Sequence, residues 1–479
     1  MPALRISMLD VADRDLIHER SLGVLEKVGV CFQSAKARAI LEKAGCRVDH
    51  DKGIVRISAE LVEWALGQLP GGVVLAGRDP AQDAPLDGSR TYATVAGICP
   101  FVVDIESGLY RRPTLDDLES VTRVADALDP FGIVWYSVKP TEGVSAKMSD
   151  LAATASMLTM TGKHVMGQVT LPAEVPYALE IARLCAGGAS LEERPIFSVI
   201  YCPVAPLQHD GPSIEAAMAL AAQHVPIDIF SLALAGATAP VALAGTIMQT
   251  NCDVLSAVVL LQLVAPGCRL IYSANSGVMD MRTARFAAST PETVLMNVAQ
   301  IELAHSYGMP ALSVGFVPDA SDLGFRGGLE DMAFALPTRL ARPEIMTGLG
   351  TLEAGQAVSF PKMLLDAEIV GYLDRLLEGV AVDDDHLSAD AISEVGPGGQ
   401  YLTRKDTRIR VRAGEHWLPR LLTRVSYGER QRGTPSEVER ATEMVLEMLA
   451  EHTPAPLPDG VAEQLADLLA TAEGELPDV

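Results

Sequence analysis

The sequence has few basic and few aromatic side chains. Of its 479 residues, 38 are lysine or arginine against 62 aspartate or glutamate, which gives a formal net charge of −24, and aromatics make up 5%. Nucleic acids and anionic membranes are bound by basic surfaces, so this deficit argues against either one as the main partner. Most of the carboxylates are expected to be solvated, and the remainder would favour a cationic ligand or a basic partner. Hydrophobic residues make up 48% of the chain, too many for a disordered protein.

The sequence also lacks the motifs of common catalytic and cofactor sites. The seven cysteines form no CxxC pair, and the nine histidines show no HxxxH or HExxH spacing. There is no GxGxxG that opens a helix after a strand, no GxxxxGK[ST] and no GxSxG. We therefore predict reduced thiols, no metal site and no bound nucleotide. His164 and His209, which border predicted strands, are expected to be structural.

Long hydrophobic runs are missing as well. The most apolar stretches, residues 233–248 and 254–261, fall short of the roughly 20 residues needed to cross a bilayer. Asn251 and Asp253 lie between them. The amino terminus lacks the apolar core of a signal peptide. These features predict a cytoplasmic protein that does not span a membrane.

What the sequence does contain is a strand–helix rhythm. Short β-rich runs begin near residues 133, 164, 196, 226, 269, 311 and 344, and each is followed by a helical pattern. The clearest helix start is Ser289-Thr-Pro-Glu292, a cap with proline in the first turn. Such alternation predicts parallel βαβ units with right-handed crossovers. Seven units fit an eight-stranded barrel better than an open sheet, although the eighth strand is not apparent.

The predicted fold is α/β: a (β/α)8 TIM barrel with an N-terminal helical and small-sheet extension and a C-terminal helical tail. We assign residues 1–130 to the extension, 131–379 to the catalytic barrel and 380–479 to a cap or oligomerisation tail. In the tail, residues 404–412 are basic and partly strand-like, whereas residues 435–451 and 461–472 have helical patterns.

The reacting groups of such a barrel lie on the loops that follow the carboxyl ends of its strands. Here these positions hold aromatics, carboxylates and amides, and no pairing of a thiol with an imidazole. This composition indicates a ligand-binding cavity, and it identifies no catalytic residue. Aromatic rings that converge with Asp319, Asp322 and Glu353 would form a box for a cation, because ring faces and carboxylates both attract positive charge. Spacing alone does not show that they converge.

Several segments resemble the trimethylamine methyltransferase (MttB-type) superfamily, in the same order and over nearly the whole chain. The longest is residues 235–255, and it is followed by residues 261–267, 279–282 and 289–292. Shorter matches are residues 25–29, 77–80, 104–108, 112–117, 366–368 and 394–402. The sequence departs from the family pattern at Arg326, where glutamine is common, and at Asp406-Thr407, where a His-Thr pair is common.

The resemblance implies a barrel that moves a methyl group from a methylated amine to the Co(I) centre of a separate corrinoid protein. The protein would bind no cofactor tightly itself, and the methyl group would be carried on the cobalamin of that partner. All residues are of the twenty standard types, so the chain resembles the branch without pyrrolysine. Members of that branch act on quaternary amines such as glycine betaine. By analogy with such barrels, the protein is also expected to form a homo-oligomer.

The resemblance turns the cation box into a set of substrate-binding candidates. The aromatic candidates are Tyr92, Tyr136, Tyr201, Phe230, Phe316 and Phe360, and the acidic ones are Asp228, Asp319 and Glu353. For the carboxylate of a betaine, Arg326 is the first choice, with Arg282 and Lys139 as alternatives. Replacing Tyr136 or Phe316 by alanine is expected to weaken quaternary-amine binding. Two other functions remain open: methyl transfer from a different donor, such as an ester, ether or sulfonium compound, and betaine binding without catalysis.

Overall fold

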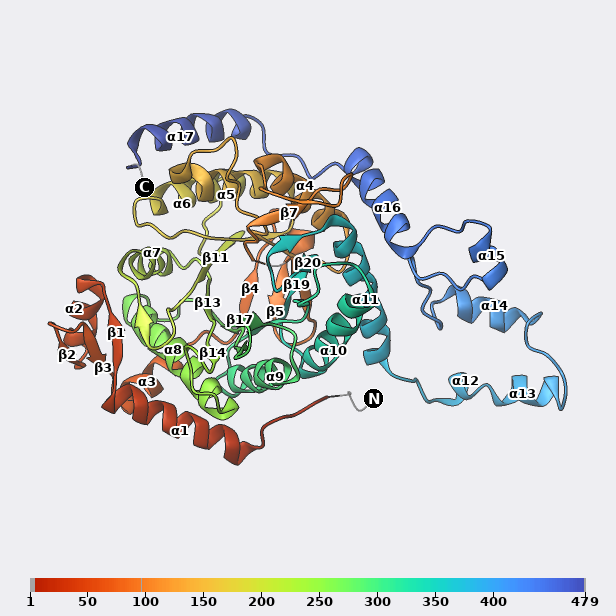
Figure 1. Cartoon of the computed structure of the whole chain (residues 1–479), viewed down its shortest axis with the longest axis horizontal. Coiled ribbons are helices and arrows are strands. Elements are labelled where there is room, and N and C mark those ends of the chain that lie inside the picture. The colour runs from red at the N-terminus through yellow and green to blue at the C-terminus, as the bar shows by residue number, and fades with distance from the viewer. Residues whose placement is uncertain (1–4, 96, 478–479) are drawn as a thin grey trace.

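Eight parallel strands form the central sheet of the protein (Figure 1). The structure is a computed structural model, and it describes residues 5–95 and 97–477. The strands, in their order around the sheet, are β6 (Tyr92–Val95), β19 (Ile345–Leu349), β18 (Ala311–Val314), β15 (Leu270–Ala274), β13 (Ile227–Ser231), β11 (Phe197–Tyr201), β10 (His164–Gly167) and β9 (Ile133–Trp135). A parallel bridge between Ala93 and Phe131 brings the two outer strands together, so the sheet is a nearly closed barrel.

All seven predicted strands are confirmed, each within one residue of its predicted start. The eighth is β6, which lies inside the segment predicted as the N-terminal extension. Its pairing with β19 shows that the barrel begins before residue 131. The strand is hard to recognise because a β-hairpin, β7 (Phe101–Val103) and β8 (Tyr110–Arg111), comes between it and its helix.

One helix follows each barrel strand. These helices are α4 (Leu115–Ala127), α5 (Ser149–Met160), α6 (Val175–Cys185), α7 (Gly211–Ala221), α8 (Leu243–Val264), α9 (Pro291–Ser306), α10 (Phe325–Ala341) and α11 (Phe360–Glu378). Sequence-encoded caps fix their starts: Thr114 and Asp117 form a capping box on α4, and Thr290 caps α9 ahead of Pro291. Side chains of the barrel strands fill one continuous core between the strands and these helices.

The N-terminal extension packs on α8. It consists of α1 (Val11–Lys27), β1 (Val30–Phe32), α2 (Ala35–Lys43), β2 (Arg47–Asp49), β3 (Ile54–Arg56), α3 (Ala59–Leu66), β4 (Val73–Leu75) and β5 (Ala84–Leu86). The segment after β4 crosses the amino end of the barrel, since Ala76 and Asp79 donate their N–H groups to the carbonyls of Pro195 and Gly162. The opposite end, where the strands finish, is therefore the mouth.

Helix α8 joins the two apolar stretches that the sequence separates. Among the described residues it is the one helix long and apolar enough to cross a membrane by length and composition, and most of it is buried inside the protein. Asn251 and Asp253 are buried within it and hydrogen-bonded: the Asn251 amide donates to the Tyr307 hydroxyl at 3.0 Å, and Asp253 accepts the Leu207 N–H at 2.9 Å. Because their polar groups are hydrogen-bonded, these two residues can lie in a helix that is buried in the core.

The regular elements of the tail, within the described residues, are all helices. Its elements are α12 (Asp384–Leu387), α13 (Ala389–Val395), α14 (Lys405–Arg412), α15 (Tyr427–Gln431), α16 (Glu437–Glu451) and α17 (Val461–Glu475). The last two confirm the predicted helices and pack on α11 and α4, and on α6. The strand-like interpretation of residues 404–412 was wrong: the alternation of Ile409 and Val411 with arginines imitates a strand, but no neighbouring strand pairs with it, and arginine and lysine favour helix.

Candidate functional site

Two aromatic side chains meet across the interior of the barrel near its mouth. The rings of Trp135 and Phe230 have centroids 5.8 Å apart and an interplanar angle of 72°. Their strands, β9 and β13, are separated by two others, which places the backbones about 14 Å apart along the sheet. The rings can touch only because both point inward. A Cβ atom at Gly97 would lie 2.8 Å from the Trp135 ring, so glycine is needed there to let the indole fit.

Asp228 lies one pleat deeper than Phe230 on the same inner face of β13. Residues two apart on a strand point to the same side. Its carboxylate accepts a hydrogen bond from the hydroxyl of Ser273 on the neighbouring strand β15. The second oxygen, Oδ2, is buried and has no partner among the described residues, and the same holds for the Trp135 indole nitrogen. Burial raises the pKa of Asp228 to about 7.

Cys202 lies beside this group at the end of β11. Its side chain is exposed, yet the surrounding protein raises the pKa of its thiol to about 12, first by burial and second through the charge of Asp228. The thiol is therefore protonated at neutral pH, which makes it a poor nucleophile. Phe230 itself is partly exposed. A ligand that enters the mouth would meet Phe230 and Cys202 first, with Trp135 and Asp228 behind them.

Three predicted aromatics point outward, toward the surrounding helices. The hydroxyl of Tyr136 donates to Asp150 on α5 at 3.2 Å, and that of Tyr201 bonds His209 at 2.6 Å. The Phe316 ring lies 5.8 Å from the ammonium of Lys362 on α11. Tyr136 comes directly after the inward-facing Trp135, and neighbouring residues of an extended chain point to opposite sides. The prediction that the three aromatics share one cavity is not supported by this arrangement.

The other predicted aromatics and acids also lie apart from the inner face. Tyr92 opens β6, so it is at the amino end of the barrel, and Phe360 is buried at the first position of α11. Asp319 accepts the N–H groups of Ala288 and Ser289 and thereby holds two loops of the mouth together. Glu353 has a φ of +50° and donates its N–H to the Ala320 carbonyl. Of the predicted aromatic and acidic residues, Phe230 and Asp228 lie on the inner face.

The three cationic candidates are already paired. Arg326 is exposed and bonds Glu330 at 2.7 Å, one turn along α10. Arg282, at a hairpin tip, pairs with Asp280 at 3.2 Å, and Lys139 pairs with Asp150 at 3.0 Å. Binding of a ligand carboxylate by any of them would compete with these ion pairs.

Both ring nitrogens of His164 and of His209, the two histidines that border predicted strands, are hydrogen-bonded to other groups of the protein. His164 is hydrogen-bonded to the Ala76 carbonyl and to Ser198, and His209 to Tyr201 and Ser256. Burial lowers the pKa of His164 to about 4 and that of His209 to about 3, so both are neutral and structural. Within residues 5–95 and 97–477, no three His, Cys, Asp or Glu side chains are grouped in a way that would hold a metal ion.

Sequence reasoning missed Trp135 altogether and gave Asp228 no special weight. The signal that would have found them is the alternation of a strand. Asp228 and Phe230 share one face of β13, and Trp135 lies on the opposite face from Tyr136. Strand position alone does not say which face is inside the barrel, because both faces of these strands are buried.

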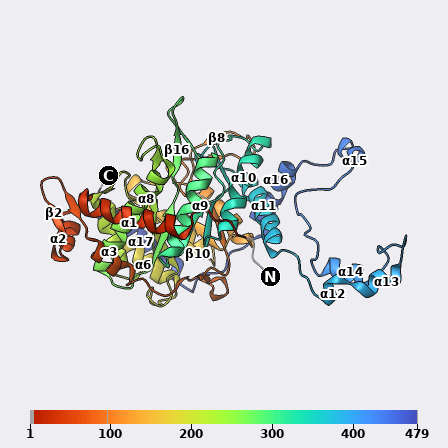
Figure 2. The same cartoon turned by 90° about the horizontal axis from the view of Figure 1, so that it is seen from below.

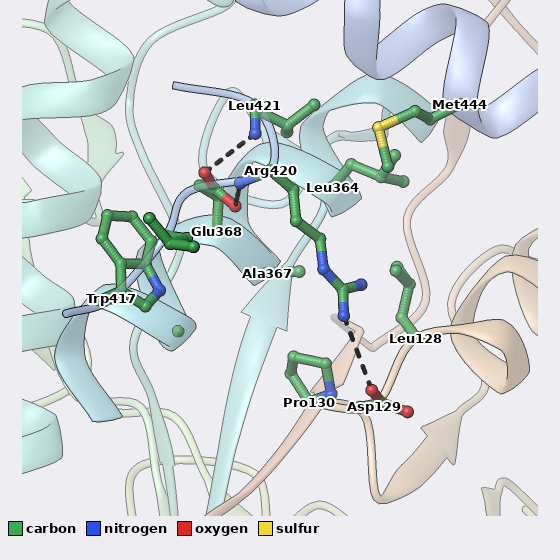
Figure 3. Close-up of a pocket in the computed structure, with 12 residues that line it drawn as sticks. Leu128, Asp129, Pro130, Leu364, Ala367, Glu368, Trp417, Arg420, Leu421 and Met444 are labelled. Atoms are coloured by element: carbon green, nitrogen blue, oxygen red, sulfur yellow. Dashed lines mark hydrogen bonds and ion pairs between the residues drawn. The ribbon is translucent and has the colours of Figure 1, made fainter. Parts of the chain in front are cut away.

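Several cavities lie outside the barrel, away from this group, and two of them adjoin the amino-terminal half of α11. One, of about 290 Å³, is formed where the tail returns to the body between Leu128, Leu364 and Trp417 (Figure 3). The other, of about 330 Å³, lies between α10 and α11. In its wall the ammonium of Lys362 is 2.7 Å from Asp331 and 2.5 Å from Asp366, and all three side chains are buried. Neither cavity contains a residue of the inner face at the mouth.

Comparison with known proteins points to one family. Residues 2–477 match the family model described as trimethylamine methyltransferase (MTTB). The chain is 31% identical over 471 residues to trimethylamine methyltransferase MttB of Desulfitobacterium hafniense, covering 96% of this chain and 92% of the relative. It is 28% identical over 456 residues to a glycine betaine methyltransferase of the same species, covering 95% and 94%.

A solved structure supports the fold. The monomethylamine methyltransferase MtmB of Methanosarcina barkeri superposes with a TM-score of 0.51 at 13% identity, covering 95% of this chain and 92% of that one. At this identity the likeness concerns the fold alone. It confirms the predicted TIM-barrel architecture with its flanking extensions.

Proposed function

Because this chain belongs to the trimethylamine methyltransferase family, we propose that it moves a methyl group from a small quaternary amine, of the betaine class, to the cobalt of a corrinoid protein. The substrate class is supported by a relative named glycine betaine methyltransferase that aligns over 95% of the chain. The methyl acceptor follows from the resemblance of the sequence to this family. The protein is then an enzyme that holds the methyl donor while its partner brings the acceptor.

The observation that carries this proposal is the pairing of aromatic rings with a buried carboxylate on the inner face of the barrel. Trp135 and Phe230 offer two ring surfaces at the mouth, and Asp228 lies beneath them. Rings attract a quaternary ammonium through their quadrupoles, most strongly when water is excluded. The charge of Asp228 is poorly screened in the protein interior, so it adds to that attraction. Trp135, Phe230 and Asp228 together therefore favour the binding of a desolvated cation.

This arrangement suits the chemistry of a quaternary amine. When one methyl leaves, the electron pair of its C–N bond stays on nitrogen, and the leaving group is a neutral amine that needs no proton. Cobalt(I) of the partner's corrinoid supplies the nucleophile. The residues of this chain have to bind the cation, orient one methyl toward the mouth and exclude water. None of these tasks requires an activated thiol, in keeping with the protonated state of Cys202.

The side chains at the rim of the mouth are of the kind that a protein partner would contact. Apolar side chains are exposed on several of the loops and helix starts that follow the strands, and the position of Gly236 shows that Met281 and Val241 lie near one another. The exposed rim residues are Leu232, Val241, Met281, Phe325 and Leu329. Exposed apolar groups concentrated around one opening are typical of an interaction surface.

The proposal is tested by methyl transfer to cob(I)alamin, followed in the visible spectrum as the acceptor becomes methylated. We expect conversion with a quaternary amine such as glycine betaine. Trp135→Leu should weaken binding of the amine by about 3- to 30-fold, the worth of one buried cation–π contact, as measured by calorimetry. Tyr136→Phe is the matched control, because its ring faces α5, and it should leave the affinity unchanged.

The same assay separates the alternatives. Conversion with an ester, ether or sulfonium donor, but with no quaternary amine, would contradict the proposed substrate. Tight binding of a quaternary amine without turnover, even with a corrinoid protein present, would indicate a binding protein. Equal loss of affinity in Trp135→Leu and Tyr136→Phe would remove the inner face as the site.

Affinity for the quaternary amine should depend on pH through Asp228. Its pKa is raised by burial to about 7, so it is protonated and neutral below that value and charged above it. Only the charged form attracts a cation, so binding is expected to strengthen as the pH rises from 6 to 8. Calorimetric titration across this range measures the effect. A profile that stays flat in the wild type would contradict a role for this carboxylate.

A further inference from the structure

Three hydrogen-bond donors at the mouth of the barrel have no partner within the described residues. The mouth is the end from which the hairpins that carry β8 and β16 (Gly277–Asp280) project (Figure 2). The Trp135 indole nitrogen and the Ser137 hydroxyl are buried there without a hydrogen bond, and the half-buried amide side chain of Gln168 also makes none. Buried polar groups in folded proteins are normally hydrogen-bonded. These donors therefore indicate a partner that comes from outside the chain.

Ser137 lies on the same inner face as Trp135, one pleat closer to the opening. The chain stays extended beyond β9, because the carbonyls of Tyr136 and Ser137 accept the N–H groups of Ile98 and Cys99. Tyr136, between the two, points outward and donates to α5. Since side chains of an extended chain alternate between its two faces, Ser137 points into the barrel.

Gln168 brings a third donor to this wall from the neighbouring strand. Strand β10 pairs with β9 in parallel, and Met166 lies opposite Trp135. A Cβ atom at Gly167 would lie 3.4 Å from the Thr154 hydroxyl on α5, so position 167 faces the helices and position 168 faces the interior. Adjacent strands are about 4.8 Å apart. The amide of Gln168 therefore lies beside the donors that follow β9.

The N–H edge of the Trp135 indole is directed toward the same wall. A Cβ atom at Gly97 would lie 2.8 Å from Cζ2 and 3.0 Å from Cε2 of this ring, and Cε2 is the atom that carries Nε1 on its other side. Residues 97–99 run beside the stretch that contains Ser137. The edge of the indole thus serves this wall, and its face stays available for a cation.

The charge at the mouth is separated across the barrel. Asp228 lies on β13, two strands away from β9 and β10 on one side, and its unpartnered oxygen attracts a cation. The opposite wall has the three neutral donors. The cations weighed for a ligand carboxylate, Lys139, Arg282 and Arg326, are bound in ion pairs of their own. A small zwitterion matches this separation, with its ammonium toward Asp228 and its anion toward the donors.

We infer that Trp135, Ser137 and Gln168 bind the carboxylate of a betaine substrate through neutral hydrogen bonds. The indole N–H can only donate, so its partner has to be an acceptor. A carboxylate accepts on both oxygens and carries no proton of its own, so it can satisfy all three donors at once. The inference rests on the proposed function, and it adds what distinguishes a betaine from other quaternary amines: specificity determined by uncharged donors.

The test compares two ligands by calorimetry: glycine betaine and tetramethylammonium, which share the quaternary nitrogen and differ in the carboxylate. The wild type should bind glycine betaine at least about 10-fold more tightly, the worth of a hydrogen bond to a charged group. Ser137→Ala with Gln168→Leu should remove this preference and leave the affinity for tetramethylammonium unchanged. Trp135→Phe, which keeps a ring but removes the N–H, should reduce the preference as well.

Ser156→Ala is the matched control. This serine is also buried, but it lies on α5 outside the barrel and donates to Glu119 at 3.0 Å, so the ligand preference should stay as in the wild type. Because the Ser137 hydroxyl has no partner within the described residues, Ser137→Ala should not lower the thermal midpoint.

The outcomes separate this inference from the proposed function. A wild type that binds both ligands equally, or a double variant that keeps the preference, would overturn the carboxylate site and leave the cation site standing. Choline bound as tightly as glycine betaine would also overturn it, because a hydroxyl would then suffice. If the wild type bound neither ligand and transferred no methyl group, the proposed function would fail, and this inference with it.

Discussion

Replacing Lys362 by methionine is expected to lower the free energy of unfolding by about 3–5 kcal/mol, the usual cost of removing one member of a buried ion pair. Its ammonium is the only cation within reach of two buried carboxylates, Asp331 and Asp366, in the described structure. Asp366 also accepts the Gly350 N–H at 2.8 Å, whereas the second oxygen of Asp331 has no partner. Without the lysine, two negative charges would remain buried and would repel each other. Urea denaturation measures the loss.

The pH dependence of this variant checks the cause. Burial and the neighbouring Asp366 charge raise the pKa of Asp331 to about 7, so protonation at low pH relieves the buried charge. Because a carboxyl with a raised native pKa contributes stability at low pH and loses it as the pH rises toward that value, the defect of Lys362→Met should be larger at pH 8 than at pH 5. An equal defect at both values would indicate that lost packing is the cause.

Arg326→Met is the matched control for this substitution. Arg326 makes an ion pair of similar length, 2.7 Å to Glu330, but its side chain is 64% exposed. Exposed helix pairs contribute only about 0.3–0.5 kcal/mol, because water already solvates both charges. A comparable loss of stability in Arg326→Met and Lys362→Met would contradict the view that burial gives Lys362 its importance.

The barrel was predictable because its strands and helices alternate regularly along the chain. Each barrel strand from β9 to β19 contains a β-branched residue and is followed by a helix, and the predicted strand starts were confirmed. The hidden strand β6 has only Tyr-Ala-Thr-Val, and a hairpin separates it from α4. Its role depends on pairing with β19, about 250 residues later in the chain, and local pattern carries no information about such a distant partner.

The site was less predictable, for a geometric reason. A strand in a closed barrel covered by helices is buried on both faces. Trp135 and Tyr136 are therefore both buried, although their side chains point to opposite faces. The face that points inward is fixed by how the barrel closes, which is a property of all eight strands together. Composition and strand position gave aromatic and acidic candidates, most of them after the carboxyl ends of strands. They could not decide between neighbours that differ by one position.

Asp228→Asn is expected to lower kcat/KM for a quaternary amine by at least about 30-fold, because removing one partner of a buried charge pair costs about 2–5 kcal/mol. The same change should make the ligand-free protein more stable at pH 8. Without a cation, Asp228 is a buried carboxylate whose Oδ2 atom has no partner among the described residues, and asparagine carries no charge to desolvate. Loss of function with gain of stability is the signature of a group retained for its ligand.

The gain in stability should disappear at low pH. Since burial raises the pKa of Asp228 to about 7, the wild-type carboxyl is already neutral at pH 5, and the two proteins should then unfold at similar temperatures. The difference should grow as the pH rises to 8, which thermal unfolding at the two pH values measures. A stability difference that does not change with pH would mean that Asp228 is not charged in the ligand-free protein at pH 8.

Asp253→Asn is the control for Asp228→Asn. It removes a buried carboxylate that lies among the helices instead of one that faces the proposed ligand. Burial raises the pKa of Asp253 to about 7 as well, and it lies on the other side of β13, where it accepts a hydrogen bond from Ser231 at 3.2 Å. Unlike Asp228, it also accepts the Leu207 N–H, so asparagine would disturb an existing hydrogen-bond network. We expect this variant to lose stability and to keep the affinity for the quaternary amine. If Asp253→Asn abolished binding while Asp228→Asn preserved it, the cation site would lie outside the barrel wall, because Asp253 belongs to α8 on the outer side of β13 and Asp228 points to the inner side.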